Sequence, residues 1–113
     1  ASVKLWWGSF GESYGFYLQG NSVYRFDYYE MTSFQPSSAR KLITFGSEYE
    51  IVDILPQITG SGLRDEDYLT VALLYNRQKN TSSLCVFNTV SGALIRQYPD
   101  MIPGRVVWLS KCL

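Results

Sequence analysis

The stretch Gly20-Asn-Ser-Val-Tyr-Arg-Phe-Asp-Tyr28 indicates the fold class of this chain. From Val23 onward, valine, arginine and aspartate alternate with three aromatic residues. A period of two residues is typical of a strand, and here it predicts that the aromatic face is buried. Gly20-Asn21 favours a tight turn because both residues tolerate positive φ, and the apolar run Tyr14–Leu18 precedes it. The whole segment therefore predicts an antiparallel hairpin.

Short apolar runs form two series, in the same order, along the chain. The first series is Tyr14–Leu18, Ser22–Asp27 and Glu50–Leu55, and the second is Thr70–Tyr75, Ser83–Asn88 and Arg105–Leu109. Corresponding runs lie roughly 55 to 60 residues apart, and repeats of short strands are typical of modular all-β folds. We therefore expect a first blade-like β unit at residues 1–58, a polar connector at 59–67 and a second β unit at 68–113.

Further apolar runs are also predicted to be strands. They are Val3–Trp7, Lys41–Phe45 and Ala93–Tyr98. Pro56 is expected to end the strand before it, and Pro99–Gly104 is expected to form a turn, because proline cannot donate a backbone hydrogen bond. No segment has the pattern of an amphipathic helix, although Ser61–Asp67 is compatible with a single turn.

The composition is that of one small domain without a strong electrostatic field. Of the 113 residues, 46% are hydrophobic and 16% are aromatic, which suffices for a modest core built from strands. Ten basic and ten acidic residues give a net charge of zero, so nucleic-acid binding loses its usual electrostatic basis. The apolar runs are far shorter than the roughly 20 residues of a membrane-spanning helix. We expect no nucleic-acid partner and no membrane span.

The absence of histidine limits the chemistry that is expected of this chain. Histidine is the commonest general base and a principal metal ligand. The acidic cluster Asp65-Glu-Asp67 lacks the spacing of a calcium-binding loop, and a solvated connector accounts for it better. We expect a protein that is not an enzyme and that uses no metal or other cofactor. Cys85 and Cys112 form no disulfide framework, which favours a reducing compartment, cytoplasmic or nuclear.

The segment Leu69–Leu109 resembles one blade of a WD40-like β-propeller. After a first strand and a polar hairpin come Leu84-Cys-Val-Phe-Asn88, a turn at Thr89-Val-Ser-Gly92 and an outer strand at Ala93–Tyr98. Tyr24-Arg-Phe-Asp27 fits the corresponding place in the first unit. The Gly-His and Trp-Asp pairs of that family are absent. The resemblance implies that the chain contains about two propeller blades.

Two blades cannot close a ring, because propellers contain roughly four to eight of them. The chain would then be part of a larger propeller, complete a ring supplied by a partner, or assemble with identical chains. The alternative is a self-contained β-sandwich or barrel of short strands, which the turn spacing suits equally well.

Adjacent aromatic residues mark the surfaces where a partner is most expected. Neighbouring side chains of a strand point to opposite faces, so a pair such as Trp6-Trp7 or Tyr28-Tyr29 cannot be buried in one core. Trp108 lies near the end of the chain, where a following repeat would dock. We predict that these five residues bind a partner, and the competing interpretation is burial beneath a neighbouring unit.

The function expected from these features is that of a non-catalytic protein-interaction or scaffold module. Its partner would be another protein, the remainder of a larger β-propeller, or further copies of the same chain. The alternative is a small carbohydrate-binding module, because sugars stack on exposed aromatic rings. A flat apolar edge with unpaired strands would favour assembly, whereas a concave aromatic patch with nearby polar side chains would favour carbohydrate.

Overall fold

The computed structural model describes residues 3–7, 14–27 and 39–107, and this part of the chain is all-β. The first sheet contains, in order, β1 (Val3–Trp7), β2 (Tyr14–Gln19), β3 (Ser22–Asp27) and β4 (Arg40–Thr44). The second contains, in order, β5 (Tyr49–Ile58), β6 (Tyr68–Asn76), β7 (Thr81–Asn88) and β8 (Leu94–Pro103). All neighbouring strands are antiparallel. The prediction of an all-β fold of antiparallel strands is confirmed.

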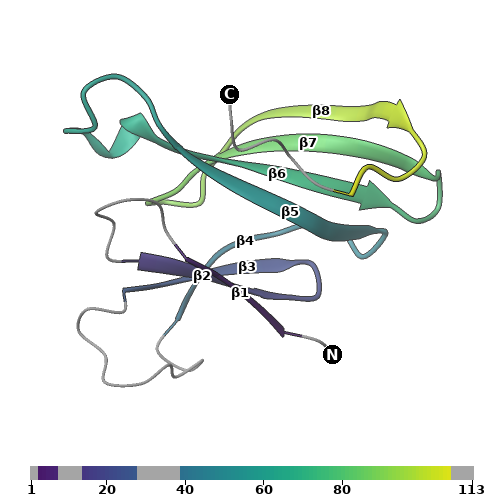
Figure 1. Cartoon of the computed structure of the whole chain (residues 1–113), viewed down its shortest axis with the longest axis horizontal. Coiled ribbons are helices and arrows are strands. Elements are labelled where there is room, and N and C mark those ends of the chain that lie inside the picture. Colours follow the sequence, from purple (N-terminus) through teal and green to yellow (C-terminus); the bar gives the residue numbers. More distant parts are fainter. Residues whose placement is uncertain (1–2, 8–13, 28–38, 108–113) are drawn as a thin grey trace.

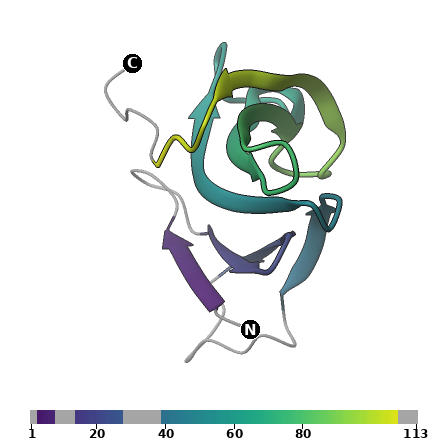
Figure 2. The same cartoon turned by 90° about the vertical axis from the view of Figure 1, so that its right-hand side faces the viewer.

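The two sheets lie face to face and share one hydrophobic core (Figure 1). Figure 2 shows the second sheet curling above the first. The core residues from the strands are Tyr14, Phe16, Leu18, Val23, Ile51, Ile54, Ala72, Leu74, Cys85 and Phe87. Phe45 joins them from the turn that connects the sheets. Removing this apolar surface from water is the main force that holds the sheets together.

Each sheet has the strand number and the up-and-down order of a propeller blade. Neither sheet closes on itself, because the first and last strands of each do not pair. Two open sheets over one core are also the arrangement of a small β-sandwich. Both architectures that the sequence suggests are therefore compatible with the strand pairing.

The chain passes from the first sheet to the second at an earlier residue than the sequence predicts. Residues 45–48 connect β4 to β5, so the strand Tyr49–Ile58 belongs to the second sheet. The segment 59–67, expected to separate two units, instead connects β5 to β6 within that sheet and contains a 3₁₀ turn at Asp65–Asp67. Glycine and polar residues suit a loop in either place, and only the pairing of the strands distinguishes the two.

Two expected strand ends are wrong. β5 continues through Pro56, and β8 continues through Pro99. Both strands lie at an edge of their sheet, where a residue without a backbone N–H is tolerated. The strand expected at Arg105–Leu109 does not form at residues 105–107, where Val106 donates to the Ser82 hydroxyl instead.

The face of β3 that enters the shared core is not the predicted aromatic face. Val23 is fully buried between the sheets, and Phe26 is buried on the opposite face. Arg25 lies on the same face as Val23. Two contacts of its guanidinium group allow this charged residue to lie beside the core. Its guanidinium carbon is 4.3 Å from the centre of the Tyr14 ring, and it donates to the Thr89 carbonyl at 3.3 Å. Both faces of this strand are therefore partly buried.

Candidate functional site

Strand β8 lies at one edge of the second sheet (Figure 1). All ten of its residues are exposed. Its large apolar side chains are 40% to 51% exposed, and they are Leu94, Ile95, Tyr98, Met101 and Ile102. We call these five residues the β8 surface. They are five of the eight exposed large apolar residues in the described part of the chain, so one strand holds most of the exposed apolar side chains.

The backbone of β8 is poorly suited to pairing with a further strand. Two irregularities interrupt its register with β7. Pro99 and Pro103 lack a backbone donor, and Asp100 has a φ of 53°. Bulges and prolines are features that protect sheet edges from uncontrolled pairing. A partner would therefore recognise mainly the side chains of the β8 surface.

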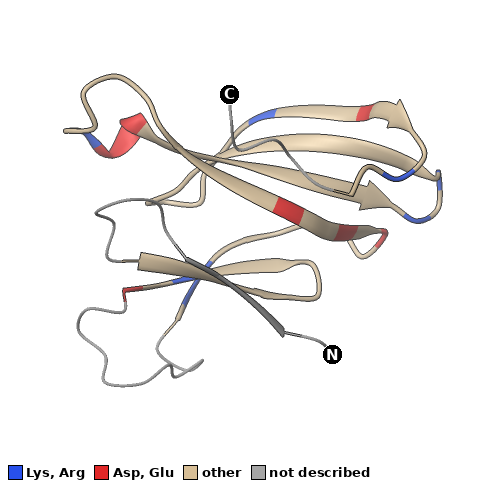
Figure 3. Ribbon diagram, in the orientation of Figure 1, with Lys and Arg blue, Asp and Glu red and all other residues tan. Residues whose placement is uncertain are grey.

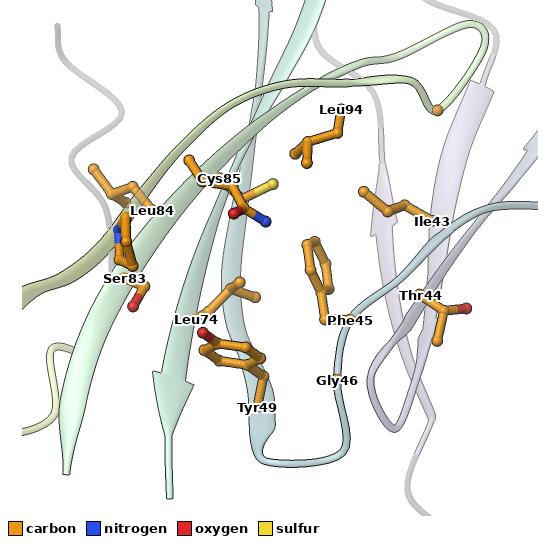
Figure 4. Close-up of a pocket in the computed structure, with 13 residues that line it drawn as sticks. Ile43, Thr44, Phe45, Gly46, Tyr49, Leu74, Ser83, Leu84, Cys85 and Leu94 are labelled. Carbon is orange, nitrogen blue, oxygen red and sulfur yellow. The ribbon is translucent and has the colours of Figure 1, made fainter. Parts of the chain in front are cut away.

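An uncharged groove of about 340 Å³ lies between β8 and the facing strand β4. Figure 4 shows Phe45, Leu74 and Cys85 within it, with Ile43 on one side and Leu94 above. All the described residues that line it are uncharged. Leu94 belongs both to this groove and to the β8 surface, so the groove meets that surface at the start of the strand.

Cys85 is the only described cysteine, and its environment suits packing better than catalysis. The side chain is fully buried in the core. Burial raises the pKa of the Cys85 thiol to about 11, so the thiol is neutral at pH 7. Because the thiolate is the nucleophilic form, this residue is a poor candidate for covalent chemistry.

A second hollow, of about 390 Å³, is lined by Arg77 and Arg105 and lies beside β5. Arg105 donates two hydrogen bonds to Glu50, at 2.7 and 2.9 Å, and this pairing raises the pKa of Arg105. The Arg105 guanidinium carbon also lies 5.1 Å from the centre of the Tyr75 ring. Arg77 donates to the Ser47 carbonyl at 3.2 Å. These contacts attach residues 104–107 and the turn between the sheets to the fold.

The Asp67 carboxylate organises the loop between β5 and β6. It is buried, and it accepts hydrogen bonds from the backbone N–H of Gly62 at 3.1 Å and of Arg64 at 3.3 Å. The Ser61 hydroxyl donates to it at 3.4 Å. Figure 3 shows the acidic turn in red at one end of the second sheet. The other two acidic residues of this cluster, Asp65 and Glu66, are exposed. The expected solvated connector is therefore a correct description of these two residues but not of Asp67.

We expect this loop to loosen in acid. Burial opposes the ionisation of Asp67, but hydrogen bonds from Arg64 and Ser61 and the charge of Arg64 outweigh it, so the pKa of Asp67 lies below 3.8. The carboxylate therefore stabilises the fold fully above about pH 4, and this stabilisation is lost as the pH falls through the folded-state pKa. Amide exchange at Gly62 and Arg64, corrected for the intrinsic rate, should accelerate in that range by roughly fivefold to tenfold.

The matched control for this prediction is Asp67→Asn, which keeps the size of the side chain but removes the titrating group. We expect faster exchange of the two amides in this variant at every pH, measured by NMR, with no further acceleration in acid. If the variant keeps the same acid-dependent acceleration as the original chain, another group controls the loop.

The five residues that the sequence predicts as partner-binding remain predictions. Trp6 and Trp7 lie in β1, where the structure describes the backbone but not the side chains. Tyr28, Tyr29 and Trp108 lie outside the described residues.

The β8 surface is not among the sites that the sequence predicts. Two pairs of apolar residues, Leu94-Ile95 and Met101-Ile102, enclose a polar centre, and this pattern was available in the sequence. The expectation of a turn from Pro99 to Gly104 divided the strand and hid the second pair. Recognising β8 as one strand requires knowing that it lies at a sheet edge.

Comparisons with known proteins assign no family to this chain. No family model, no curated protein and no solved structure matches it. Within residues 3–7, 14–27 and 39–107, no three His, Cys, Asp or Glu residues are placed to hold a metal ion. The same part of the chain contains no helix that is long and apolar enough to cross a membrane.

Proposed function

We propose that this chain is a non-catalytic protein-interaction module that works within a larger β-propeller-like assembly. The observation that carries the proposal is the β8 surface, with five large apolar side chains exposed along one strand. Large apolar side chains that are exposed together on one element of a soluble domain often mark a surface that binds a partner. Covering these side chains would supply the hydrophobic part of the binding free energy.

The groove beside β8 supports recognition through apolar contacts. Its described lining is uncharged, and the whole chain has a net charge of zero. Long-range electrostatic attraction would therefore contribute little to the encounter with a partner. Shape and apolar area would determine affinity, as they do in the buried centres of protein interfaces.

The stacked four-stranded sheets support the propeller part of the proposal. Neighbouring blades of a propeller are antiparallel sheets that pack face to face, which is also the relation between the two sheets here. In a ring of such sheets, an edge strand such as β8 would stay accessible to a partner. The chain would then contribute both to the ring and to binding.

Solution mass, measured by light scattering during size-exclusion chromatography, tests this proposal. We expect the chain to have a mass above the 12.9 kDa of one copy. The double variant Leu94→Ser/Ile102→Ser should return to 12.9 kDa. The control Ile58→Ser/Leu63→Ser, which changes exposed apolar residues outside β8, should remain associated. A chain of 12.9 kDa that unfolds cooperatively would contradict the proposal.

Carbohydrate binding stays a prediction that depends on the tryptophan and tyrosine pairs near the start of the chain. Among the described residues, Tyr98 is the one aromatic side chain that is strongly exposed. The Arg96 guanidinium donates to its hydroxyl at 3.4 Å. A single ring beside an arginine provides less stacking surface than sugar recognition usually requires, so the interaction module is the better-supported proposal.

A further inference from the structure

We infer that the groove between β4 and β8 binds a small, neutral, mostly apolar molecule that carries a carbonyl or a similar hydrogen-bond acceptor. Three observations carry this inference: the fixed walls of the groove, its uncharged lining, and a buried hydroxyl group without an acceptor. The inference goes beyond the proposed function, because the ligand lies between the sheets and its binding does not require that β8 associates with a protein.

The groove exists because the second sheet extends beyond the cover that the first sheet provides. Cys85 of β7 lies opposite Ala72 of β6 on one side and opposite Gln97 of β8 on the other. Residues that lie opposite each other share a face of the sheet, so Gln97 is on the core-facing side together with Cys85. Cys85 is fully buried, whereas Gln97 is exposed. The core-facing side is therefore left open between β7 and β8.

Contacts at both ends of the groove fix the position of β4. At one end, Gly92 in the turn between β7 and β8 lies directly against the backbone of Leu42. The Arg40 guanidinium also donates to the Val90 carbonyl at 2.8 Å. At the other end, residues 45–48 join β4 to β5. A ligand would therefore enter a site whose walls are already in place, as is usual for small-molecule pockets.

The size and the lining of the groove indicate the class of ligand. Its volume of about 340 Å³ is at the small end of the roughly 300–1,000 Å³ that is typical of ligand pockets. Its deepest side chains are apolar and buried, and they are Phe45, Leu74 and Cys85. No described residue of the lining carries a charge that could offset a buried charge of the ligand. A neutral molecule is therefore favoured over an ionised one.

A buried hydroxyl group in the groove lacks an acceptor. Ser83 is only 3% exposed and lies opposite Leu74, on the side of the sheet that faces the core. The Ser83 oxygen accepts a hydrogen bond from the Asp100 backbone N–H at 2.9 Å. The hydroxyl hydrogen has no acceptor among the described residues. Leaving a buried donor unpaired costs free energy, so an acceptor atom of a ligand would stabilise the site.

Two further polar groups of the lining are open to a ligand. The Tyr49 hydroxyl and the Gln97 side-chain amide form no hydrogen bond with any described residue. Figure 4 shows Tyr49 and Ser83 toward the lower end of the groove and Leu94 at its upper end. A ligand would therefore place its acceptor near Ser83 and its apolar body against Phe45 and Leu94.

Binding of three naphthalene derivatives tests this inference, because they share one apolar body and differ in one substituent. The probes are acetylnaphthalene, which is a neutral ketone, ethylnaphthalene, which lacks the oxygen, and naphthoate, which is charged. Their affinities are measured by displacement of prodan, a neutral fluorescent naphthyl ketone. We expect the ketone to bind about fivefold more tightly than the hydrocarbon, because of one net hydrogen bond. Naphthoate should bind at least about tenfold more weakly than the ketone.

Ser83→Ala removes the buried donor. We expect the affinity for the ketone to fall about fivefold and the affinity for ethylnaphthalene to stay the same. The hydrocarbon is needed as a reference because Ser83→Ala also removes the acceptor of the Asp100 N–H, and a general change in the groove would weaken both ligands alike. The control Thr81→Val removes another hydrogen bond to Asp100, of 2.8 Å, outside the groove, and it should preserve the preference for the ketone.

Chemical-shift changes in NMR spectra locate the bound ketone. We expect changes at the amides of Phe45, Leu74 and Cys85, and none at Arg77 and Arg105 beside the second hollow. Changes confined to residues outside the groove would overturn the inference, as would equal affinities for the ketone and the hydrocarbon, or no binding up to the solubility limit of the probes. A monomeric chain that binds the ketone in the groove would contradict the proposed function and leave this inference standing.

Discussion

Replacing Phe16 with alanine is expected to lower the free energy of unfolding by about 3–5 kcal/mol. Phe16 is fully buried on the face of β2 that meets the second sheet. Its ring also packs edge-on against Tyr14, with 5.6 Å between the ring centres. The change removes apolar contacts from both sheets at once and leaves a cavity that the rigid strands can fill only in part. Urea unfolding followed by tryptophan fluorescence measures the loss.

The control for this experiment is Leu63→Ala, because Leu63 is 87% exposed. Truncating an exposed side chain away from the core usually changes the free energy of unfolding by less than about 0.5 kcal/mol. A domain of this size has a total stability of only about 5–15 kcal/mol, so the loss at Phe16 would remove a large share of it. If the two variants lose equal stability, Phe16 does not join the two sheets.

Replacing Gly92 with alanine is expected to cost about 2–5 kcal/mol, combining backbone strain with a steric clash. Gly92 has a φ of 80°, a conformation that is unfavourable for alanine. A Cβ atom there would lie 2.1 Å from the backbone oxygen of Leu42 in β4. Nearby, the Arg40 guanidinium donates to the Val90 carbonyl at 2.8 Å. The turn between β7 and β8 therefore touches the first sheet, and the substitution would push the sheets apart.

Gly20→Ala isolates the backbone-strain part of this effect. Gly20 also has a positive φ, of 62°, but no atom lies within 4 Å of the position that its Cβ would occupy. We expect only the strain of about 1–2 kcal/mol in this variant. The loss of unfolding free energy in Gly92→Ala minus that in Gly20→Ala, measured by thermal and urea unfolding, reports how closely the sheets approach. Equal losses would mean that the turn and β4 are not in contact.

Strands with strong local signals could be predicted from the sequence alone. The hairpin around Gly20-Asn21 forms as expected, because a turn that tolerates positive φ joins two apolar runs. The turn before β8 also forms, with Asn88 accepting hydrogen bonds from the backbone N–H groups of Val90 and Ser91 at 2.8 Å. In both places the residues that determine the turn lie within a short stretch of the sequence.

Features that depend on distant parts of the chain could not be predicted in the same way. The second sheet determines which face of β3 enters the shared core, since Arg25 on that face donates to the Thr89 carbonyl across the interface. The role of Asp67 depends on a loop that folds back onto its carboxylate. The continuation of β8 through Pro99 depends on its position at an edge, so the sequence alone does not predict the candidate site.

Amide hydrogen exchange at increasing protein concentration tests most directly whether this chain associates through β8, as the proposed function expects. β5 is the opposite edge strand of the same sheet and serves as an internal reference. We predict that exchange at Leu94–Tyr98 slows as the concentration rises, while exchange in β5 stays constant, because only the first of these edges would be covered. Exchange in β8 that does not change with concentration, or that changes equally in both strands, would contradict this account.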